Sequence, residues 1–563
     1  MALVPIENVG AGGIVSDFKP YQLQPNQWSS GRNVEFTDGS ISKIEGYREV
    51  MESCPIEPWH LGVYQDFDLS GKQARDGFYW IAFGVKKIYV YNTSKDPKWN
   101  DVTRDGEDYN TEEGSNWKVE QSGALLIATN GIDTPQIWPL DEENKVSVDN
   151  KFEDMTSWVE DNTEGETDIT CQSLSGFKNH IIATNILRTL NDNPVNQIQD
   201  RMIKWSTQHG HYKEPLTWDV LNDTQDAGEY ELLDTPGPIV GTMPMGEVFM
   251  IYKTDSIYMM SYIGTPYIFS FKALDPDTGI ISKGAVAEFP GGHFFVSFAD
   301  CYVNNGQQVT PILTGKVRDE MFDNLNGDHY DRIFCVTQPH YNEIWACYPT
   351  ASNEYCDRAM VWNYKDNTFT FRDLPNITDA KLGVAAVRDS TEQSLSWDDI
   401  DPDPSIPLVP WTSLTTMKWG TIQYDNVVTN LVMASPVNIK LFRDRAGQLN
   451  DTVVMYAFVE RTGIDLGDPS SVKQLRAVWP KIETSGNSIP MQVYTGYQMA
   501  TDKPVTWEGP YTFDPDTQSK ISVRATGKFL GVRFESRSDS SWTISGLELE
   551  YESSGRRGSR VYA

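Results

Sequence analysis

The 563-residue sequence has only six cysteines, and no two of them form a C-x-x-C pair. Its seven histidines are scattered, so the sequence contains no recognisable Cys/His zinc pattern. No stretch approaches the roughly 18–20 apolar residues that a membrane-spanning helix needs. The N-terminus lacks the basic start and long apolar run of a signal peptide. We therefore expect reduced cysteines and synthesis in a cytoplasm.

Catalytic motifs are also missing. There is no G-x-S-x-G elbow, no P-loop and no dinucleotide fingerprint in a strand–helix context. Residues 275–279 (DPDTG) lack the later glutamate of a calcium loop, so we expect a turn there. The acidic pairs Asp275/Asp277, Glu112/Glu113 and Asp398/Asp399 could serve glycoside hydrolysis, but that depends on a separation in space. We expect no enzymatic activity, no metal and no cofactor.

Basic charge is scarce. The chain has 47 Lys and Arg against 79 Asp and Glu, a net charge of −32. Such a surface repels phosphates, so tight sequence-independent nucleic-acid binding is not expected. The charge could let DNA slide past the protein, or it could only keep a large protein soluble.

Helical periodicity is rare, whereas aromatic residues are abundant, with 17 Trp, 26 Tyr and 23 Phe. Residues 357–375 show the dominant pattern. Met360, Trp362 and Tyr364 alternate with Val361 and Asn363, residues 365–367 form a polar turn, and a second alternating run follows over 368–372. This predicts a β-hairpin with an aromatic face.

Similar units recur at irregular spacing, most clearly with second strands at residues 87–89, 135–138, 255–258 and 342–345. Repetition without intervening helices predicts a β-propeller, with a set of β-sandwiches as the rival. Tryptophans inside the strands are expected in the core rather than on a carbohydrate-binding surface: Trp80, Trp138, Trp345 and Trp362. Residues 317–324 could form one short helix.

We predict an all-β chain with few short helices in three parts. Residues 1–50 form an N-terminal arm with a first hairpin around Asp38-Gly39. Residues 51–462 form a β-propeller-like domain with acidic loop insertions. Residues 463–563 form a β-sandwich of about six strands with a basic tail, by the strand spacing typical of such folds. Two acidic excursions, residues 96–116 and 141–168, are expected as surface insertions, and residues 389–410 as a connection.

Several stretches, in order, resemble the tail nozzle proteins of short-tailed bacteriophages (podoviruses), which include tail tubular protein B and the packaged-DNA stabilisation proteins. They are the opening GGIVSDFKPYQLQPNQWSSGRNVEFTDGSISKIEGY (12–47), residues 250–306, PILTGKVRDEMF (311–322), the run from NEIWACYP to FRDLP (342–375) and the ending 526–557. The acidic excursions match no pattern of that family.

The resemblance implies a structural virion component made in the host bacterial cytoplasm. It would form a homo-oligomer, a hexameric ring, below the portal and adaptor. The ring would enclose the DNA channel without sequence-specific binding, retain and release the packaged genome, and dock tail fibres or spikes. Candidate channel or docking residues are Asp96, Asp101, Asp105, Glu112, Asp141, Glu142 and Glu143. Candidate inter-subunit contacts are Arg556, Arg557 and Arg560, unless the tail is only solvated.

Two other hypotheses remain open. The first is a receptor-binding or glycan-degrading phage tail protein, although such proteins are usually trimers with long β-helices. The second is a stand-alone bacterial propeller enzyme or lectin, which would normally carry the secretion signal that is missing here.

Overall fold

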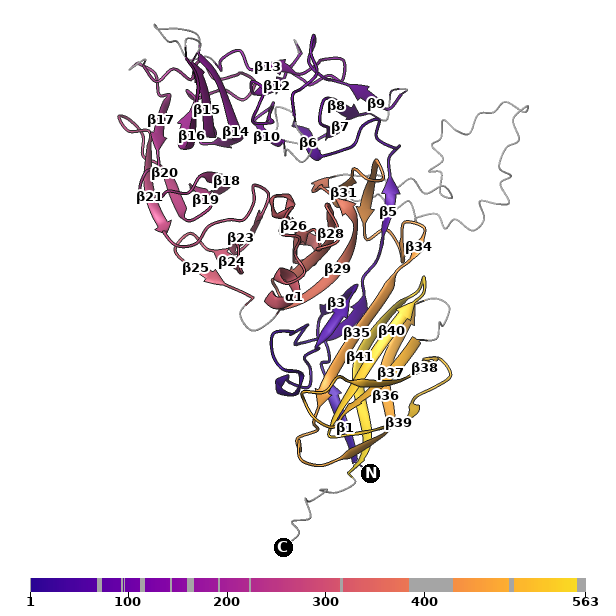
Figure 1. Cartoon of the computed structure of the whole chain (residues 1–563). Helices are drawn as coiled ribbons and strands as arrows, with labels where there is room; N and C mark the ends of the chain where they lie inside the picture. Colours follow the sequence, from indigo (N-terminus) through magenta and orange to yellow (C-terminus); the bar gives the residue numbers. More distant parts are fainter. Residues whose placement is uncertain are drawn as a thin grey trace, which may run out of the picture.

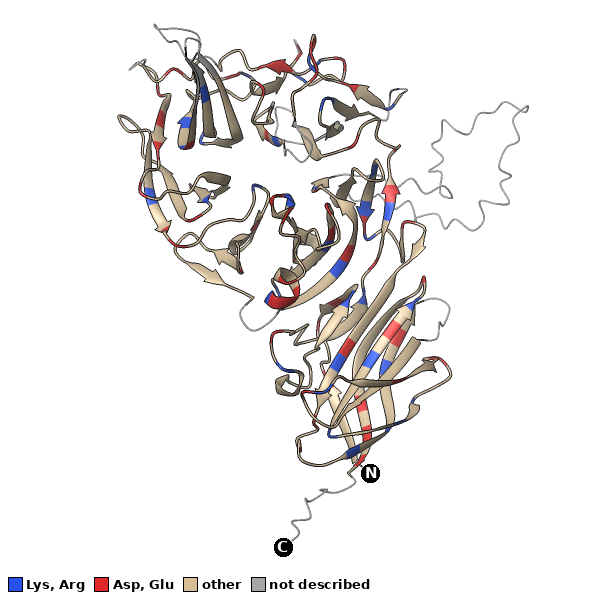
Figure 2. Ribbon diagram, viewed as in Figure 1, with Lys and Arg blue, Asp and Glu red and all other residues tan. Residues whose placement is uncertain are grey.

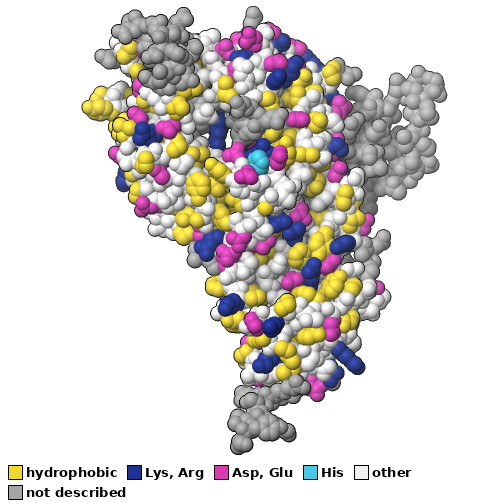
Figure 3. All heavy atoms as spheres, viewed as in Figure 1, with side chains coloured by type: hydrophobic (Ala, Val, Ile, Leu, Met, Phe, Trp, Pro, Cys, Tyr) yellow, Lys and Arg dark blue, Asp and Glu magenta, His cyan; other side chains and the backbone are white. Residues whose placement is uncertain are grey.

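Alternating apolar and polar residues form strands throughout the chain (Figure 1). The computed structural model describes residues 2–553 except 68–72, 93–94, 96, 112–116, 142–143, 159–166, 191–192, 222–223, 314–316, 384–428 and 486–490. In Figure 1 the strands form a wide propeller joined to a narrower sandwich, which carries the N-terminus. The space-filling view in Figure 3 tapers in the same way.

The predicted hairpin at residues 357–375 is confirmed. Strands β28 (Cys356–Asn363) and β29 (Thr368–Ile377) pair with Asn363 opposite Thr368. The side-chain oxygen of Asn363 accepts hydrogen bonds from the backbone N–H groups of Lys365 and Asp366, each at 3.0 Å. Both faces of the hairpin are buried, with Trp362 in one core and Val361 in another. A hairpin with two buried faces fits a layered stack of sheets.

Seven four-stranded antiparallel sheets, here named blades A to G, make up the propeller. Blade A contains β6 (His60–Phe67), β7 (Gln73–Phe83), β8 (Ile88–Tyr91) and β9 (Trp99–Asp101). Blade B contains β10 (Lys118–Ser122), β11 (Leu125–Thr129), β12 (Gln136–Trp138) and β13 (Glu153–Asp154). Blade C contains β14 (Thr167–Phe177), β15 (His180–Leu190), β16 (Asn193–Trp205) and β17 (Gly228–Glu231). Blade D contains β18 (Ile239–Met245), β19 (Val248–Lys253), β20 (Ile257–Tyr262) and β21 (Phe269–Asp275). Blade E contains β22 (Val286–Phe289), β23 (Gly292–Val296), β24 (Cys301–Asn304) and β25 (Val309–Pro311), and blade F contains β26 (Phe334–Gln338), β27 (Glu343–Tyr348), β28 and β29.

Blade G is completed by the N-terminal part of the chain. It contains β30 (Asp379–Gly383), β31 (Asn430–Ser435), β32 (Lys440–Asp444) and, as its outermost strand, β5 (Tyr47–Val50). Strand β5 pairs antiparallel with β32, Tyr47 lying opposite Asp444. The innermost strands contact one another in the order β6, β10, β14, β18, β22, β26, β30 and back to β6. The propeller is therefore a closed ring of seven blades.

The sandwich contains two sheets. One has the order β3 (Val34–Thr37), β4 (Ser40–Lys43), β41 (Ser541–Ser553), β36 (Lys473–Ser485), β39 (Ile521–Gly527), with β1 (Ala2–Glu7) also paired to β41. The other has the order β2 (Ser30–Arg32), β35 (Tyr456–Ile464), β40 (Phe529–Arg537), β37 (Met491–Gln498), β38 (Thr506–Phe513). A small hairpin, β33 (Leu449–Asn450) and β34 (Val453–Val454), precedes β35.

The N-terminal 50 residues are not a separate arm. Strands β1 to β4 belong to the sandwich and β5 belongs to blade G, so the sandwich combines both ends of the chain. The expected hairpin around Asp38-Gly39 is present as β3 and β4, and the expected short helix is α1 (Arg318–Phe322). Three 3₁₀ turns, η1 (Pro20–Gln22), η2 (Tyr330–Arg332) and η3 (Pro339–Tyr341), are the other helical segments described. None of the described helices is long and apolar enough to cross a membrane.

The core contains the strand tryptophans, as expected: Trp80, Trp138, Trp345 and Trp362 are all buried. All six cysteines are free thiols, and five of them are buried.

A buried network of charges joins the sandwich to blades F and G. Arg445, just after β32, contacts Glu35 on β3 (2.7 Å) and Glu343 on β27 (2.8 Å). Arg372 on β29 contacts Asp444 at 2.6 Å, and both side chains are almost fully buried. Removing one partner of a buried ion pair strongly destabilises a protein, because the remaining charge stays buried without a counter-ion. The network therefore fixes the angle between the two modules.

Asn33 adds further hydrogen bonds at the same junction. Its side-chain nitrogen donates to Asp373 Oδ2 and to the Tyr456 carbonyl, each at 2.8 Å, and its side-chain oxygen accepts the Asp373 N–H at 2.9 Å. Asn33 has φ of 56°, a left-handed conformation that asparagine tolerates better than most residues. This residue thus connects the N-terminal segment, blade F and β35.

Replacing Arg445 with alanine would leave Glu35 and Glu343 buried without their cation. We expect a loss of about 3–5 kcal/mol in the free energy of unfolding, measured by urea denaturation. The matched control is Arg537→Ala in the sandwich, whose side chain is 70% exposed and which should cost less than about 1 kcal/mol. Equal stability of the two variants would contradict a fixed junction.

A buried histidine links blades D and E. His293 on β23 accepts a hydrogen bond from the Tyr252 hydroxyl at Nδ1 (2.8 Å) and donates from Nε2 to the Pro244 carbonyl (3.0 Å). Asn304 donates to the same hydroxyl at 3.1 Å. Burial lowers the pKa of His293 to about 4. The folded chain therefore holds this imidazole neutral where the unfolded chain would protonate it.

That shift predicts a loss of stability in mild acid. As the pH falls below about 6.5, His293 becomes protonated in the unfolded chain, whereas in the folded chain it stays neutral down to about pH 4. The free energy of unfolding therefore decreases by roughly 3 kcal/mol over this window. His293→Gln should flatten that part of the pH–stability curve, whereas the exposed His340→Gln should not. Parallel curves for wild type and His293→Gln would contradict the assignment.

Candidate functional site

The two acidic excursions lie together on the outer rim of blades A and B. The first follows β9, the outermost strand of blade A, and the second flanks β13, the outermost strand of blade B. Figure 2 shows acidic segments on β13 and in the loops near β9. We call residues 99–110, 141 and 144–154 the acidic ledge. It lies away from the innermost strands, so it does not line the axis of the propeller.

Ion pairs connect the two excursions. Lys151 pairs with Asp105 at 2.7 Å, and Lys95 pairs with Asp149. Asp101 pairs with Lys87 at 3.1 Å and accepts the Thr103 N–H at 3.0 Å. Burial alone would raise the pKa of Asp101, but these hydrogen bonds and the Lys87 charge outweigh it, and the pKa is lowered. The ledge is thus an internally bridged platform rather than a set of mutually repelling loops.

Arg104 is the central cation of the ledge. Its guanidinium contacts Asp133 Oδ1 at 3.0 Å and Asp154 Oδ1 at 3.5 Å, and its carbon lies 4.7 Å from the centre of the Tyr109 ring. Burial acts to raise the pKa of Asp133, but hydrogen bonds from Asn110 and Asn130 and the Arg104 charge lower it overall. Arg104 therefore anchors the first excursion to blade B.

The structure brings together only part of the predicted set. Asp101 and Asp105 are in the ledge as ion-paired residues. Asp141 forms a turn, its carboxylate accepting the Lys145 N–H at 3.0 Å. The remaining predicted residues lie outside the described part of the chain: Asp96, Glu112, Glu142, Glu143, Arg556, Arg557 and Arg560.

Sequence reasoning missed Arg104. The sequence marks Arg104 only as an isolated arginine in an acidic loop. Its partners Asp133 and Asp154 are 29 and 50 residues away along the chain.

One of the three acidic pairs considered for glycoside hydrolysis lies in the described part of the chain. Asp275 accepts the N–H groups of Asp277 and Thr278 at 3.0 and 3.1 Å, which is the expected turn. Glu112/Glu113 and Asp398/Asp399 fall outside the described residues. Within the described ranges, no three His, Cys, Asp or Glu side chains come together as a metal site would require.

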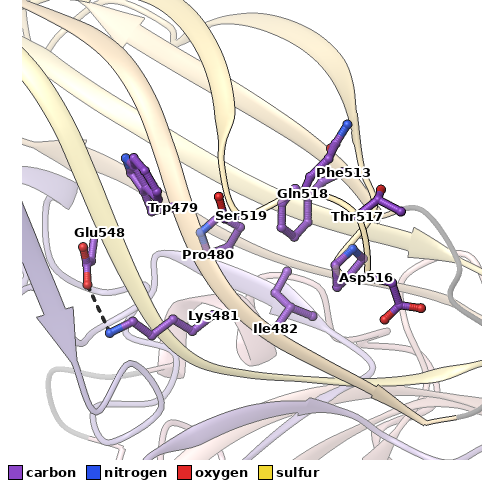
Figure 4. Close-up of a pocket in the computed structure, with 11 residues that line it drawn as sticks. Trp479, Pro480, Lys481, Ile482, Phe513, Asp516, Thr517, Gln518, Ser519 and Glu548 are labelled. Atoms are coloured by element: carbon purple, nitrogen blue, oxygen red, sulfur yellow. Dashed lines mark ion pairs between the residues drawn. The ribbon is translucent and has the colours of Figure 1, made fainter.

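A pocket of about 550 Å³ lies on the sandwich beside Trp479 and the loop 515–519 (Figure 4). Lys481 and Glu548 at its edge form an ion pair at 3.1 Å, drawn as a dashed line in Figure 4. The Trp479 indole donates to Glu550 at 3.3 Å, and Lys520 lies 4.8 Å from the ring centre. Lys481 and Glu548 of its lining are therefore already paired with each other.

Comparison with known proteins adds little. No protein-family model and no curated protein matches the chain. The CNH domain of AfRom2 is 10% identical over 61% of this chain and 91% of that one, with a TM-score of 0.30. Apo AztD from Citrobacter koseri is 8% identical over 56% and 86%, with a TM-score of 0.28. These scores are too low to carry an inference, so the fold assignment depends on this chain's own strand pairing.

Arg104→Ala should release the ledge without unfolding the propeller. We expect the free energy of unfolding to decrease by about 1–3 kcal/mol, because Asp133 is left buried without its cation. Amide hydrogen exchange should increase over residues 104–110 and 153–154 but not in blade D. The control Lys87→Ala removes an exposed pair and should change exchange little. Unchanged exchange in Arg104→Ala would show that the ledge does not depend on this residue.

Proposed function

We propose that this protein is a structural component of a short-tailed bacteriophage tail. In this proposal, copies of the chain form a ring below the portal and adaptor, enclose the DNA channel, retain the packaged genome and release it during ejection. The observation that carries the proposal is where the nozzle-like stretches fall in the fold. Three of the five stretches (12–47, 342–375 and 526–557) supply strands at the junction of the two modules, whereas 250–306 falls in blades D and E and 311–322 includes α1.

The opening stretch, residues 12–47, supplies β2, β3 and β4 of the sandwich and leads into β5. The run 342–375 supplies β27, β28 and β29 of blade F, and β29 contacts both β2 and β3. The ending 526–557 supplies β40 and all of β41, which pairs with β1 and β4. The resemblance therefore follows the frame of the molecule, which is the part that a shared architecture would require.

Mechanical and electrostatic features fit the same role. The propeller is closed by pairing between distant parts of the chain, and the buried ion network ties it to the sandwich. Such a frame resists deformation by the pressure of packed DNA. The net charge of −32 disfavours adhesion of the DNA backbone to the wall of a channel.

Within this role, the acidic ledge is the part of the chain that we expect to vary in sequence. It matches no nozzle-like pattern, it lies on the outer rim, and it is held both by internal ion pairs and by packing of Val102, Tyr109 and Phe152 in the core of blades A and B. We assign it to docking of a fibre, a spike or a neighbouring subunit. A docking surface on a rigid scaffold can change in sequence while the frame is retained.

The decisive experiment is the mass of the purified protein in solution, alone and with its adaptor, followed by negative-stain imaging. We expect six-fold rings with a central hole, formed alone or templated by the adaptor. A trimeric spike, or a monomer that never assembles with the adaptor, would overturn the proposal. Release of sugar from host polysaccharide by the purified protein would instead favour the receptor-binding or glycan-degrading alternative.

A further inference from the structure

The outer edge of the propeller carries an exposed aromatic surface where blades C and D meet. Strand β17 is the outermost strand of blade C and β21 is the outermost strand of blade D, with β20 beside it. These strands lie together at one outer edge in Figure 1, and Figure 3 shows hydrophobic side chains at the same rim. The exposed fractions range from 41% to 75% in the residues that we call flank 1: Tyr230, Leu233, Tyr262, Ile263 and Tyr267.

The aromatic rings of flank 1 pack on other rings beneath them. The Tyr230 ring stacks on Phe271, with the ring centres 4.5 Å apart and the planes at 5°. Tyr262 packs edge-on against Phe269, with the centres 5.8 Å apart. Trp205 connects the two pairs, because its ring centre lies 5.3 Å from that of Phe269 and 6.3 Å from that of Phe271. Flank 1 is therefore a preformed surface of rigid aromatic side chains, the type that is enriched at protein interfaces.

A second exposed apolar surface lies along blade G. The turn between β31 and β32 exposes Val437 and Ile439, and the hairpin β33–β34 exposes Val453 and Val454, with exposed fractions from 38% to 65%. Both segments adjoin β5 or the chain just after it, since the Ile439 carbonyl accepts the Cys54 N–H at 3.2 Å and β33 contacts β5. We call these four apolar residues flank 2.

The hairpin of flank 2 is separate from the sheets of both modules. Strands β33 and β34 pair only with each other in a two-stranded sheet, with two residues in each strand. A two-stranded hairpin by itself is at best marginally stable in water. Covering Val453 and Val454 with another apolar surface would stabilise it, because their side chains would leave the solvent.

The two flanks lie on opposite sides of the propeller. In the closed ring, blades A and B separate blade G from blade C, and blades E and F separate it from blade D. The boundary between blades C and D is therefore directly across from blade G, and Figure 1 shows β17 and β21 on one side and β5 and β34 on the other. A head-to-tail contact between copies requires two different surfaces, and it builds a ring when the rotation between the copies closes.

Charged neighbours of both flanks have partners within their own blade. Next to Tyr230 in flank 1, Glu229 pairs with Arg188 at 2.5 Å. Next to flank 2, Lys440 pairs with Glu49 at 2.6 Å. A partner that covers the flanks can leave these pairs intact, which avoids the cost of burying a single charge.

The apolar area of the flanks matches what one interface needs. A large aromatic side chain measures roughly 150–250 Å², so the exposed fractions of the nine flank residues correspond to roughly 800 Å² in total. A standard interface buries about 1,600 Å² on the two partners together, of which somewhat more than half is apolar. Flank 1 of one copy and flank 2 of another therefore supply about the apolar share of one standard interface.

We propose that flank 1 of one copy of this chain binds flank 2 of a neighbouring copy. The inference rests on the ring proposed above, because it names the surfaces through which the subunits of that ring contact each other. A contact between two different surfaces leaves one of each exposed at the ends of an open assembly, so growth stops only when the ring closes.

The test is analytical ultracentrifugation of the whole chain, alone and with the adaptor, for the wild type, Tyr267→Lys in flank 1 and Val453→Lys in flank 2. Each substitution places a charge in one flank, and we expect association at least about tenfold weaker than in the wild type, because the new ammonium group must be desolvated. The matched control is Met499→Lys on the sandwich, whose side chain is 50% exposed and which should assemble like the wild type. Leu233→Lys and Val437→Lys provide a second variant in each flank.

An equal mixture of the two variants distinguishes a head-to-tail contact from a symmetric one. Tyr267→Lys keeps flank 2 and Val453→Lys keeps flank 1, so one contact can form between them. We therefore expect the mixture to give dimers that neither variant forms alone. A symmetric contact of flank 1 with itself would instead give dimers of Val453→Lys alone. The circular dichroism spectra of all variants should equal that of the wild type, because exposed substitutions rarely unfold a protein.

Variants of both flanks that assemble like the wild type would overturn this inference and leave the ring itself in place. A mixture that stays monomeric would also overturn the head-to-tail contact. A wild type that stays monomeric even with the adaptor would overturn both proposals. Assemblies other than six-fold rings that both variants abolish would contradict the six-fold ring but support the contact between the flanks.

Discussion

The molecule depends on one constraint, which is that its first 50 residues must pair with strands formed hundreds of residues later. Strands β1 to β4 complete the sandwich, and β5 closes the propeller. Joining such distant segments carries a loop-closure entropy cost, which the buried core and strand pairing must exceed. Glu35, Arg445 and Glu343 place charged contacts at the same junction. The propeller and the sandwich therefore depend on each other for stability, although each has the architecture of an independent domain.

Charge has two different roles in this protein. On the outer rim, acidic residues are bridged by cations such as Arg104 and Lys151, so the ledge is ordered despite its composition. At the junction of the two modules, carboxylates and an arginine are buried together, as Arg445 pairs with Glu35 and Glu343. The net charge of −32 describes neither place.

Part of the candidate site could be predicted from the sequence. The excursions 96–116 and 141–168 were recognisable as polar, acidic interruptions of the strand pattern, but the burial of Val102, Tyr109 and Phe152 in the core of blades A and B was not expected. Their contact with each other was not predictable, since it follows from the adjacency of blades A and B.

The sequence by itself determined the strands, the hairpin at residues 357–375, the short helix near residue 318 and the all-β class. Those features depend on local alternation and turn chemistry, which a short window of residues contains. Only the tertiary structure decided that there are seven blades, that β5 completes the last one, and that β1 to β4 belong to the sandwich. Pairing between distant strands depends on which edges remain free once the other sheets have formed. No local pattern records that information.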